Sequence, residues 1–510
     1  MIVSYNQADE LDRSSLPNQL FLIAILLGVG LRLIASVWGD IGVYVDGASR
    51  IAMAMRWAEH PAWQGLSGVW PPTHIYVLGI LIRLWNQPVL LAKLIGFFCG
   101  VATLFALRNT VRHRFGPTVA ALSALLLAVY WTHIWLSSSY WVEVPYLLFV
   151  LLAVNFAEKT NTSFDWKHAF ACGLFLSLAM LLRNEGLLLF VIFTLWFLLR
   201  IRKLGILALF VVLPGAVMAW YLIEPTLHGY SYFDYFKYVT RSKETENLVG
   251  NISRRDALIQ WILMLSAAPT LIVAVPGLYE LWKNRRRALT DLLAWMFVAQ
   301  VGFYFFLTLT SAWRPQLRYL MIQFVNLLPY AAVGWLKIMQ RFSIRYALAA
   351  MLALMIVMQS VAWWIGRNNR LPGGWLPMQV ITSSQETLDQ WVGKINTGEQ
   401  PPLKIVSLVP GPRAERWALE HSFVVNRLTT NRSSMQELDV HVQPEILRGV
   451  MPAQVADADV VLIDSNAVFY PVVLGAIGRQ KPDTPIRRLH PHIDAILLSE
   501  RARSELMSVP

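Results

Sequence analysis

Cysteine and charge are the two things that this sequence has little of. Only two cysteines occur among 510 residues, Cys99 and Cys172, and both lie in apolar stretches. Two such thiols cannot form a disulfide framework or a cysteine-based metal site. Charged residues make up 15% of the chain, hydrophobic residues make up 56%, and the mean hydropathy is +0.46. A soluble domain of this length needs far more charge to cover its surface, so the composition predicts an integral membrane protein.

Long apolar runs recur along most of the chain. Runs of about 15–22 residues can cross a bilayer core of about 30 Å, allowing for tilt and local thinning. The fold class predicted is mainly α, a polytopic membrane protein of about eleven transmembrane helices. The predicted spans are 19–38, 89–107, 117–136, 142–157, 169–182, 186–200, 204–223, 257–281, 289–310, 317–336 and 346–365.

The first span is expected to be retained and not cleaved. No small-residue cleavage site follows it, and the residues before it include acids such as Asp9 and Asp12 in place of a basic region. These features argue against a signal peptide. Residues 1–18 are therefore predicted to form a cytoplasmic N-terminal segment.

The net charge of +12 suggests nucleic-acid binding at first sight, but the positions of the cations argue otherwise. They lie in short clusters between apolar runs, which suits loops on the cytoplasmic side of a membrane. We therefore expect no nucleic-acid partner, an inside N-terminus and an outside C-terminus. Five predicted inner loops then hold 15 cations: Arg108, Arg112, Arg114, Lys159, Lys167, Arg200, Arg202, Lys203, Lys283, Arg285, Arg286, Arg287, Lys337, Arg341 and Arg345.

Two segments have an alternative interpretation. The short spans 169–182 and 186–200 would be read otherwise as one long tilted helix, which would invert the topology after it. The stretch 71–88 is apolar but opens with two prolines, and if it crossed fully, the cations of 108–114 would lie outside. We therefore expect it to lie at the outer interface, with Tyr76 and Trp85 among its aromatic anchors.

The composition changes after residue 366. We predict a transmembrane domain at 19–366, a linker at 367–376 and a small soluble extracytoplasmic α/β domain at 377–510. Apolar runs rich in β-branched residues predict strands there, and two segments predict helices. The expected strands are 404–409, 423–428, 460–464 and 495–498, and the expected helices are 415–420 and 471–477.

Four groups of polar residues are predicted at the outer ends of spans. The first is Asp46, in the first outer loop. The others are the turn 137–145 with Glu143, the turn Arg183-Asn184-Glu185, and the segment 313–319 with Arg314, Arg318 and Tyr319. Charges near membrane depth usually pair, face a cavity or carry function. An acid just beyond a span is also a common solvated cap, so function rests on all four groups sharing one face.

These residues resemble a family. The chain is similar to the GT-C superfamily of membrane glycosyltransferases, and above all to the glycosyltransferase family 39 or RgtA/B/C/D-like group. Protein O-mannosyltransferases and aminoarabinose transferases are related to that group. Asp46 matches the first-loop acid, and Glu143 stands where an acid follows the third span. Pro71-Pro72 with Tyr76 matches a segment in which two prolines are followed, some residues later, by a tyrosine. Arg318-Tyr319 matches the Arg-Tyr that opens a late span, over a resemblance covering about residues 20–340.

Two departures concern the family's metal chemistry. Many members have a second acid directly after the first-loop acid, whereas Gly47 follows Asp46 here, and many have leucine where Thr73 stands. A second metal-binding acid is thus missing from that position.

The resemblance implies a function. It implies transfer of a hexosyl or pentosyl sugar from a polyprenyl-phosphate donor to a lipid, glycan or protein acceptor. Asp46 would be the general base of an inverting reaction, because a carboxylate must take the proton of an acceptor hydroxyl. Glu143 would assist it. Guanidinium groups pair with phosphate, so the donor would be bound by cations together with neighbouring polar and aromatic groups. These binding candidates are Arg183, Arg314, Arg318, Tyr319, His74 and Tyr76.

The reaction could use a divalent metal ion, and no other cofactor is expected. Glu143 and His74 would be its ligands. A lone histidine in an interfacial helix is otherwise a hydrogen-bonded or snorkelling residue, and this second interpretation stays open.

Two other functions compete with the transferase. A transporter or flippase for a lipid-linked glycan would explain the spans, but it favours charges near the bilayer midplane and two related halves. An O-antigen ligase or polymerase also acts on lipid-linked glycans at the outer face, but would not need Asp46. The expected location in each case is a bacterial inner membrane, with the N-terminus cytoplasmic.

Overall fold

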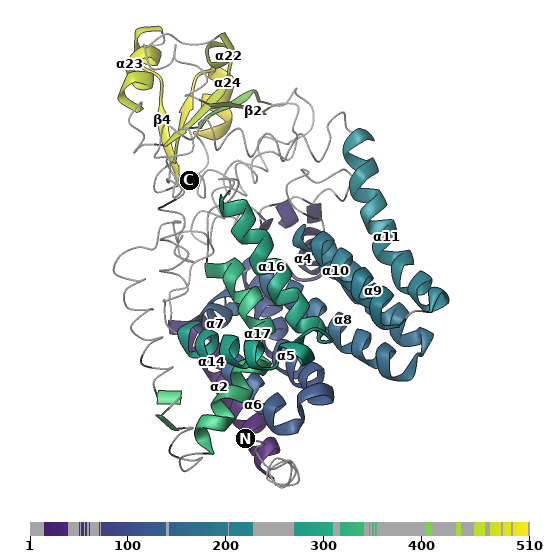
Figure 1. The fold of residues 1–510 in the computed structure, drawn as a ribbon. Coiled ribbons are helices and arrows are strands. Elements are labelled where there is room, and N and C mark those ends of the chain that lie inside the picture. Colours follow the sequence, from purple (N-terminus) through teal and green to yellow (C-terminus); the bar gives the residue numbers. More distant parts are fainter. Residues whose placement is uncertain are drawn as a thin grey trace. The chain divides into compact units, whose positions relative to one another are not determined.

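The protein is represented by a computed structural model, and two compact units can be distinguished in it (Figure 1). The first comprises Met1–Gly39, Gln64–His74 and Lys93–Asn368, and the second comprises Asp40–Trp63, Ile75–Ala92 and Asn369–Pro510. The structure describes residues 15–38, 50–51, 53–55, 57–58, 61, 71, 73–138, 142–201, 203–227, 255, 270–309, 317–340, 346, 349–350, 352–353, 357, 403–409, 435–439, 453–464, 470–480, 483–490 and 493–507.

Helices make up the first unit, as the apolar runs predict. Two helices, α4 and α5, begin in one unit and end in the other. The helices are α2 (Leu16–Trp38), α4 (Thr73–Leu84), α5 (Pro88–Phe115), α6 (Pro117–Ala128), α7 (Trp131–Ser138), α8 (Glu143–Ser163), α9 (Trp166–Met180), α10 (Glu185–Arg200), α11 (Leu204–Leu227), α14 (Thr270–Lys283), α15 (Arg285–Ala288), α16 (Leu292–Leu309) and α17 (Leu317–Met339).

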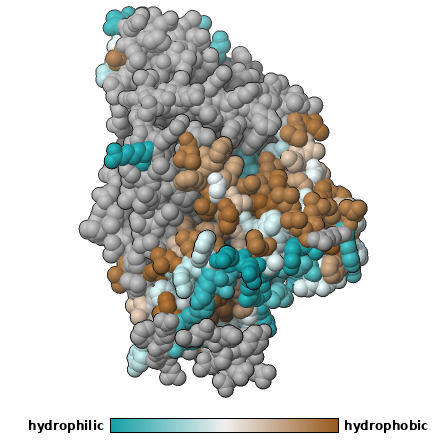
Figure 2. Space-filling model, in the orientation of Figure 1, coloured by the Kyte–Doolittle hydropathy of each residue, from teal (hydrophilic) through white to brown (hydrophobic). Residues whose placement is uncertain are grey.

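Several of these helices are suited to a bilayer. Among the described residues, α2, α5, α11 and α17 are each long and apolar enough to cross a membrane, and α6 with α7 makes a fifth if the bent pair counts as one span. Figure 2 shows hydrophobic side chains over the sides of helices and a hydrophilic band along one end of them. The protein is thus a multi-pass membrane protein. The total of eleven spans stays a prediction.

The predicted span 117–136 is broken. Helices α6 and α7 meet at an angle of 61°. The guanidinium of Arg32, on α2, forms hydrogen bonds on both sides of the break. Its Nη1 donates to the carbonyl of Ala128 at 3.4 Å, and its Nη2 donates to Nδ1 of His133 at 2.5 Å. Both side chains are fully buried. A side chain inserted into the helix ladder is a known cause of a sharp bend. The predicted span 117–136 is therefore made of two helices that meet at a bend.

Helices α9 and α10 are two helices, and the single long helix is excluded. Helix α9 starts beside the end of α8, and the turn after it brings Arg183 to Glu143 at the start of α8. Helix α10 then returns toward the Arg114 end of the helices, as shown by Trp196, which donates its indole N–H to the carbonyl of Thr290 at 3.4 Å. Thr290 in turn accepts a hydrogen bond from Arg114, which pairs with Glu158 near the far end of α8. The chain therefore reverses direction between the two helices.

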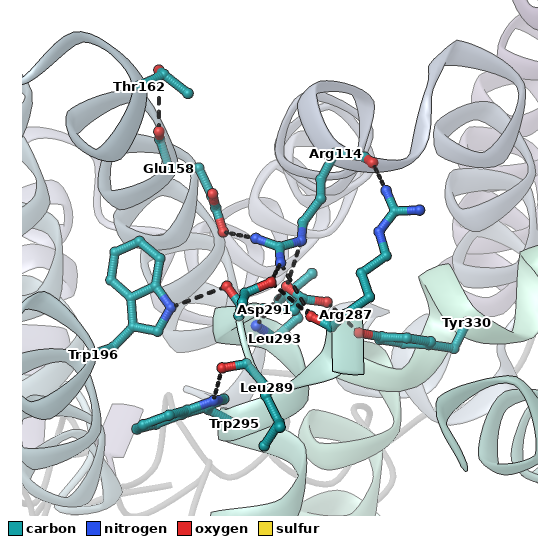
Figure 3. A network of polar contacts seen from close by, with 11 residues as sticks. Arg114, Glu158, Thr162, Trp196, Arg287, Leu289, Asp291, Leu293, Trp295 and Tyr330 are labelled. Carbon is teal, nitrogen blue, oxygen red and sulfur yellow. Dashed lines mark hydrogen bonds and ion pairs between the residues drawn. The ribbon is translucent and has the colours of Figure 1, made fainter. Parts of the chain in front are cut away.

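A polar network joins the helices at that far end (Figure 3). Arg114 of α5 pairs with Glu158 at 3.2 Å and approaches Asp291 at 3.7 Å. The hydroxyl of Tyr330 donates to the other oxygen of Asp291 at 2.6 Å. This network brings together the predicted inner loops 108–114 and 283–287 and the end of α8. They lie at one end of the helices, as the charge pattern requires.

Helix α4 is short and exposes one apolar face. Its 12 residues extend about 18 Å, well short of the about 30 Å of a bilayer core. Ile75 and Leu78 are buried, whereas Ile80 and Leu84 are exposed. A buried apolar face opposite an exposed apolar face suits the interfacial position predicted for this segment.

The second unit contains a five-stranded sheet in the order β2-β1-β3-β5-β4. Strands β1 and β3 pair in parallel, as do β1 and β2, while β5 runs antiparallel to its two neighbours. Val406, Val461 and Ile496 of the sheet pack with Val473 and Ile477 of a helix. The elements are β1 (Ile405–Val409), β2 (Met435–Asp439), α22 (Ala453–Ala456), β3 (Val460–Asp464), α23 (Tyr470–Gln480), β4 (Ile486–His490), β5 (Ile493–Leu497) and α24 (Glu500–Leu506).

The strands predicted at 404–409, 460–464 and 495–498 are those of the sheet's centre, and α23 covers the predicted helix 471–477. Strands β2 and β4 were not predicted. They are the two edges, and their sequences are too polar to show the apolar pattern of a buried strand. The predicted strand 423–428 and helix 415–420 lie outside the described residues.

Candidate functional site

A buried arginine lies between two carboxylates at the end of the helices opposite Arg114. The Arg183 guanidinium donates through Nη1 to Oε1 of Glu143. It also binds Glu185 in bidentate fashion, with Nε to Oε2 at 3.1 Å and Nη2 to Oε1 at 2.5 Å. The Glu143 side chain is 0% exposed and that of Arg183 is 8% exposed. All three guanidinium nitrogens are therefore engaged by acids.

Tyrosines surround this triad. The hydroxyl of Tyr304, in α16, donates to Oε1 of Glu185 at 2.8 Å. The Arg183 guanidinium lies 5.0 Å from the ring centroid of Tyr319, in the first turn of α17. The Tyr304 and Tyr319 rings are 5.5 Å apart. We call the group formed by Glu143, Arg183, Glu185, Tyr304 and Tyr319 the outer cluster, from its predicted side.

The chain reversal after α9 is what positions the cluster. It leaves Arg183 and Glu185 in a tight turn, with Gly186 packed so closely on α9 that a Cβ there would lie 2.6 Å from Cα of Met180. The start of α8 supplies Glu143, and the start of α17 supplies Tyr319. The backbone N–H of Thr73, at the start of α4, donates to the carbonyl of Leu181 in the same turn at 3.4 Å.

Three of the four predicted polar groups thus meet, although they are far apart in the sequence. These are the groups of Glu143, Arg183 and Tyr319. Asp46, from the fourth group, lies outside the described residues, as does Arg314. Arg318 lies in the first turn of α17 beside Tyr319, and its side chain is outside what the structure describes.

The two remaining candidates are in helix α4. His74 is its second residue and is buried. Tyr76 packs edge-on against Trp57, with the ring centroids 5.3 Å apart. Within the part of the chain that the structure describes, no group of three histidine, cysteine, aspartate or glutamate side chains is arranged to hold a metal ion. Glu143, one of the two predicted metal ligands, is bound to Arg183.

Among the described residues, the cluster holds two carboxylates and one guanidinium, and each tyrosine adds polarity without charge. Unpaired charge is costly away from water, so these groups are held together by their mutual interactions. Three of the five N–H donors of Arg183 bind these carboxylates, which also offset its charge. Its position over Tyr319 makes it a residue that holds the start of α17, next to Arg318.

Sequence reasoning missed two members of the cluster. Glu185 was part of a predicted polar turn, but no role was given to it. Tyr304 lies within an apolar span, where a tyrosine is common and carries no distinguishing signal. Arg32 could have been noticed, because it is the one cation inside the first predicted span.

Comparison with known proteins finds similarity in the fold but not in the sequence. No protein-family model matches the chain, and no curated protein matches its sequence. Solved structures do match. The oligosaccharyltransferase of Archaeoglobus fulgidus, in complex with Zn and sulfate, aligns with a TM-score of 0.57 and 13% identity, over 87% of this chain and 68% of that one. ArnT from Cupriavidus metallidurans, bound to undecaprenyl phosphate, aligns with a TM-score of 0.54 and 13% identity, over 94% of this chain and 98% of that one.

This chain shares its fold with these two proteins, both of which are glycosyltransferases of the GT-C superfamily. A third match covers 88% of this chain and 69% of the other, with 14% identity and a TM-score of 0.51. It is the archaeal oligosaccharyltransferase AglB from Archaeoglobus fulgidus, in complex with an inhibitory peptide and a dolichol-phosphate. At identities this low, the GT-C likeness concerns the path of the chain, while the site must be argued from this chain's own residues.

Proposed function

We propose that the protein is a glycosyltransferase that moves a sugar from a polyprenyl-phosphate carrier to an acceptor hydroxyl at the outer face of the membrane. The observation that carries the proposal is the outer cluster: three polar groups predicted for such a site meet at one end of a GT-C fold. Of the structural neighbours, ArnT is bound to undecaprenyl phosphate and AglB to a dolichol-phosphate. Both compounds belong to the carrier class proposed here.

The proposed reaction is a single inverting displacement. Asp46 takes the proton of the acceptor hydroxyl as its oxygen attacks the anomeric carbon. The bond from that carbon to the phosphate oxygen breaks, and polyprenyl phosphate leaves with the electron pair. No covalent intermediate with the protein is required, so one base is sufficient.

The departing phosphate needs cations, and we assign this role to Arg318 and Arg314. Guanidinium pairs with phosphate in bidentate fashion. Arg183 is given a different role from the one first expected, because its nitrogens are bound to Glu143 and Glu185. It would hold Tyr319 and the start of α17, and Glu143 would act through it.

The remaining binding candidates are His74 and Tyr76 of α4. Thr73 bonds to the turn that holds Arg183, so the start of α4 adjoins the outer cluster. We propose that His74 contacts the donor's headgroup region. Tyr76 would support the helix through Trp57. No reaction step is assigned to a metal ion.

A deletion strain would identify the acceptor. Mass spectrometry of its glycolipids and glycoproteins should show one acceptor lacking one sugar, with the polyprenyl-linked donor accumulating. Loss of a whole transported glycan from every acceptor would favour the flippase. Loss of polymer length or of ligated O-antigen, with all single sugars in place, would favour the ligase or polymerase.

Replacing Arg318 tests the phosphate assignment. Charge-assisted hydrogen bonds contribute about 1.5–3 kcal/mol, so Arg318→Ala should lower transfer roughly 10–100-fold. Arg318→Lys should keep part of the activity, because the charge remains while the bidentate geometry is lost. Exposed Arg112, at the other end of the helices, provides the matched control Arg112→Ala. If transfer by Arg318→Ala and Arg318→Lys were equal and near normal, Arg318 would be an interfacial anchor only.

Reporter fusions test the proposed orientation. A reporter fused at Thr290, next to the Arg114 network, should give a cytoplasmic signal, and one at Gln400 should give an external signal. The expectation follows from the 15 cations in the five loops assigned to the cytoplasm. An external signal at Thr290 would invert the topology and move the outer cluster to the wrong face for the proposed reaction.

A further inference from the structure

A basic and aromatic surface lies at the end of the helices opposite the outer cluster. One face of α14 packs on α17: Gly277 lies against Leu327, and Glu280 pairs with Lys337 at 2.5 Å. The other face is exposed and apolar. Val275, Leu278, Tyr279 and Trp282 follow a helical spacing along it, and the last two are 60% and 72% exposed.

Cations cover the rings at the end of this face. The Lys283 ammonium lies 5.6 Å from the ring centroid of Tyr279, and the Arg285 guanidinium lies 5.6 Å from that of Trp282. Arg286 follows in α15, a helix with no buried residue. We call Tyr279, Trp282, Lys283, Arg285 and Arg286 the basic corner.

The described part of the chain offers no acidic partner to the cations of the basic corner. Among the described residues, no carboxylate lies within ion-pair distance of Lys283, Arg285 or Arg286. Arg287, their neighbour, is engaged within the protein, because it donates to the carbonyl of Arg114 and lies 4.9 Å from the ring centroid of Phe115. Three positive charges are therefore left to act outward.

A second surface at the same end has the same composition. Lys203 lies 4.2 Å from the ring centroid of Phe164, and Lys167 lies 5.9 Å from that of Trp166, which is 56% exposed. Phe164 and Trp166 join α8 to α9, just beyond Glu158 of the Arg114 network. Exposed rings beside cations thus recur at this one level.

We propose that the basic corner is a binding site for an anionic phospholipid, with the phosphate on the three cations and the acyl chains along the apolar face of α14. Charge complementarity selects an anionic lipid, because the choline of a zwitterionic one would be repelled. The apolar face favours a lipid over other anions. It adjoins the cations and would contact the acyl chains, which other anions lack. Aromatic rings at the headgroup level and cations above them match the usual order of groups across that interface. The site is separate from the proposed transferase chemistry.

Lipid titration of the full-length protein tests this site. Native mass spectrometry of the protein in neutral detergent would compare phosphatidylglycerol with phosphatidylcholine. Each surface cation contributes about fivefold, so the charge-removing variant Lys283→Gln/Arg285→Gln/Arg286→Gln should lose roughly 100-fold in affinity for phosphatidylglycerol. Binding of phosphatidylcholine should change little. Phosphatidylglycerol bearing a photoreactive acyl chain should label α14 in the wild type and not in the variant.

Two controls separate charge from fold. Arg285→Lys/Arg286→Lys keeps the charge and should keep the lipid preference. Arg83→Gln/Lys404→Gln/Arg479→Gln removes three other exposed cations and should also keep it. An unchanged preference in the charge-removing variant would overturn the proposal. So would displacement of the lipid by glycerol phosphate or an oligonucleotide at equal concentration, because the surface would then be a general anion site.

Discussion

Replacing Asp46 with asparagine is expected to lower turnover by roughly 100–10,000-fold, the usual contribution of a positioned general base. Asparagine keeps the shape of the side chain but cannot take the acceptor's proton. The lost interaction acts in the transition state, so the amount of protein and the affinity for donor lipid should change little. The measurement is the rate of sugar transfer by purified protein, with donor binding measured separately.

Asp46→Glu provides a control for this substitution, because it keeps the base and shifts its position. Its rate should lie between those of the wild type and Asp46→Asn. A solvated cap without catalytic function would give a lower protein level with a normal rate per molecule. A normal rate for Asp46→Asn would remove Asp46 from the mechanism.

Replacing Arg183 with methionine is expected to be the most damaging change to the fold among the site residues. It would take away the guanidinium that pairs with both the buried Glu143 and the half-buried Glu185. Removing one partner of a buried ion pair commonly costs about 3–5 kcal/mol of unfolding free energy. Thermal unfolding of the purified variant should start well below that of the wild type, and transfer should be lost with it.

A compensating variant tests the reason for that loss. Arg183→Met combined with Glu143→Gln and Glu185→Gln removes both stranded charges and should recover part of the stability, but not the transfer activity. Exposed Arg112→Met is the matched control and should unfold like the wild type. A stable Arg183→Met protein would mean that the two acids do not depend on Arg183.

The sequence predicted the helical membrane character because apolar length is a local property. Predicted spans such as 204–223 and 317–336 coincide with α11 and α17. The bend between α6 and α7 was not predicted, because its cause lies elsewhere in the chain. Arg32, on α2, binds the carbonyl of Ala128, and no residue from 118 to 138 is a proline or glycine.

In the outer cluster, too, local features could be predicted from the sequence and long-range contacts could not. Charged turns at span ends identified Glu143 and Arg183, because a charge at membrane depth stands out in an apolar sequence. The pairing between them is a long-range contact that periodicity does not contain. It changed the proposed role of Arg183 from binding phosphate to holding Tyr319. Edge strands β2 and β4 were missed for a related reason, since their stability comes from their neighbours and not from their own apolar pattern.

The most direct measurement of the proposed function follows the sugar itself. Purified protein would be mixed with a polyprenyl-phosphate donor labelled in its sugar and with an extract of cell-envelope acceptors. The proposal predicts that label moves to an acceptor, that one polyprenyl phosphate is released for each sugar transferred, and that Asp46→Asn abolishes nearly all of both. Label that stays on the donor lipid, while the lipid crosses the membrane of reconstituted vesicles, would contradict a transferase and identify a transporter.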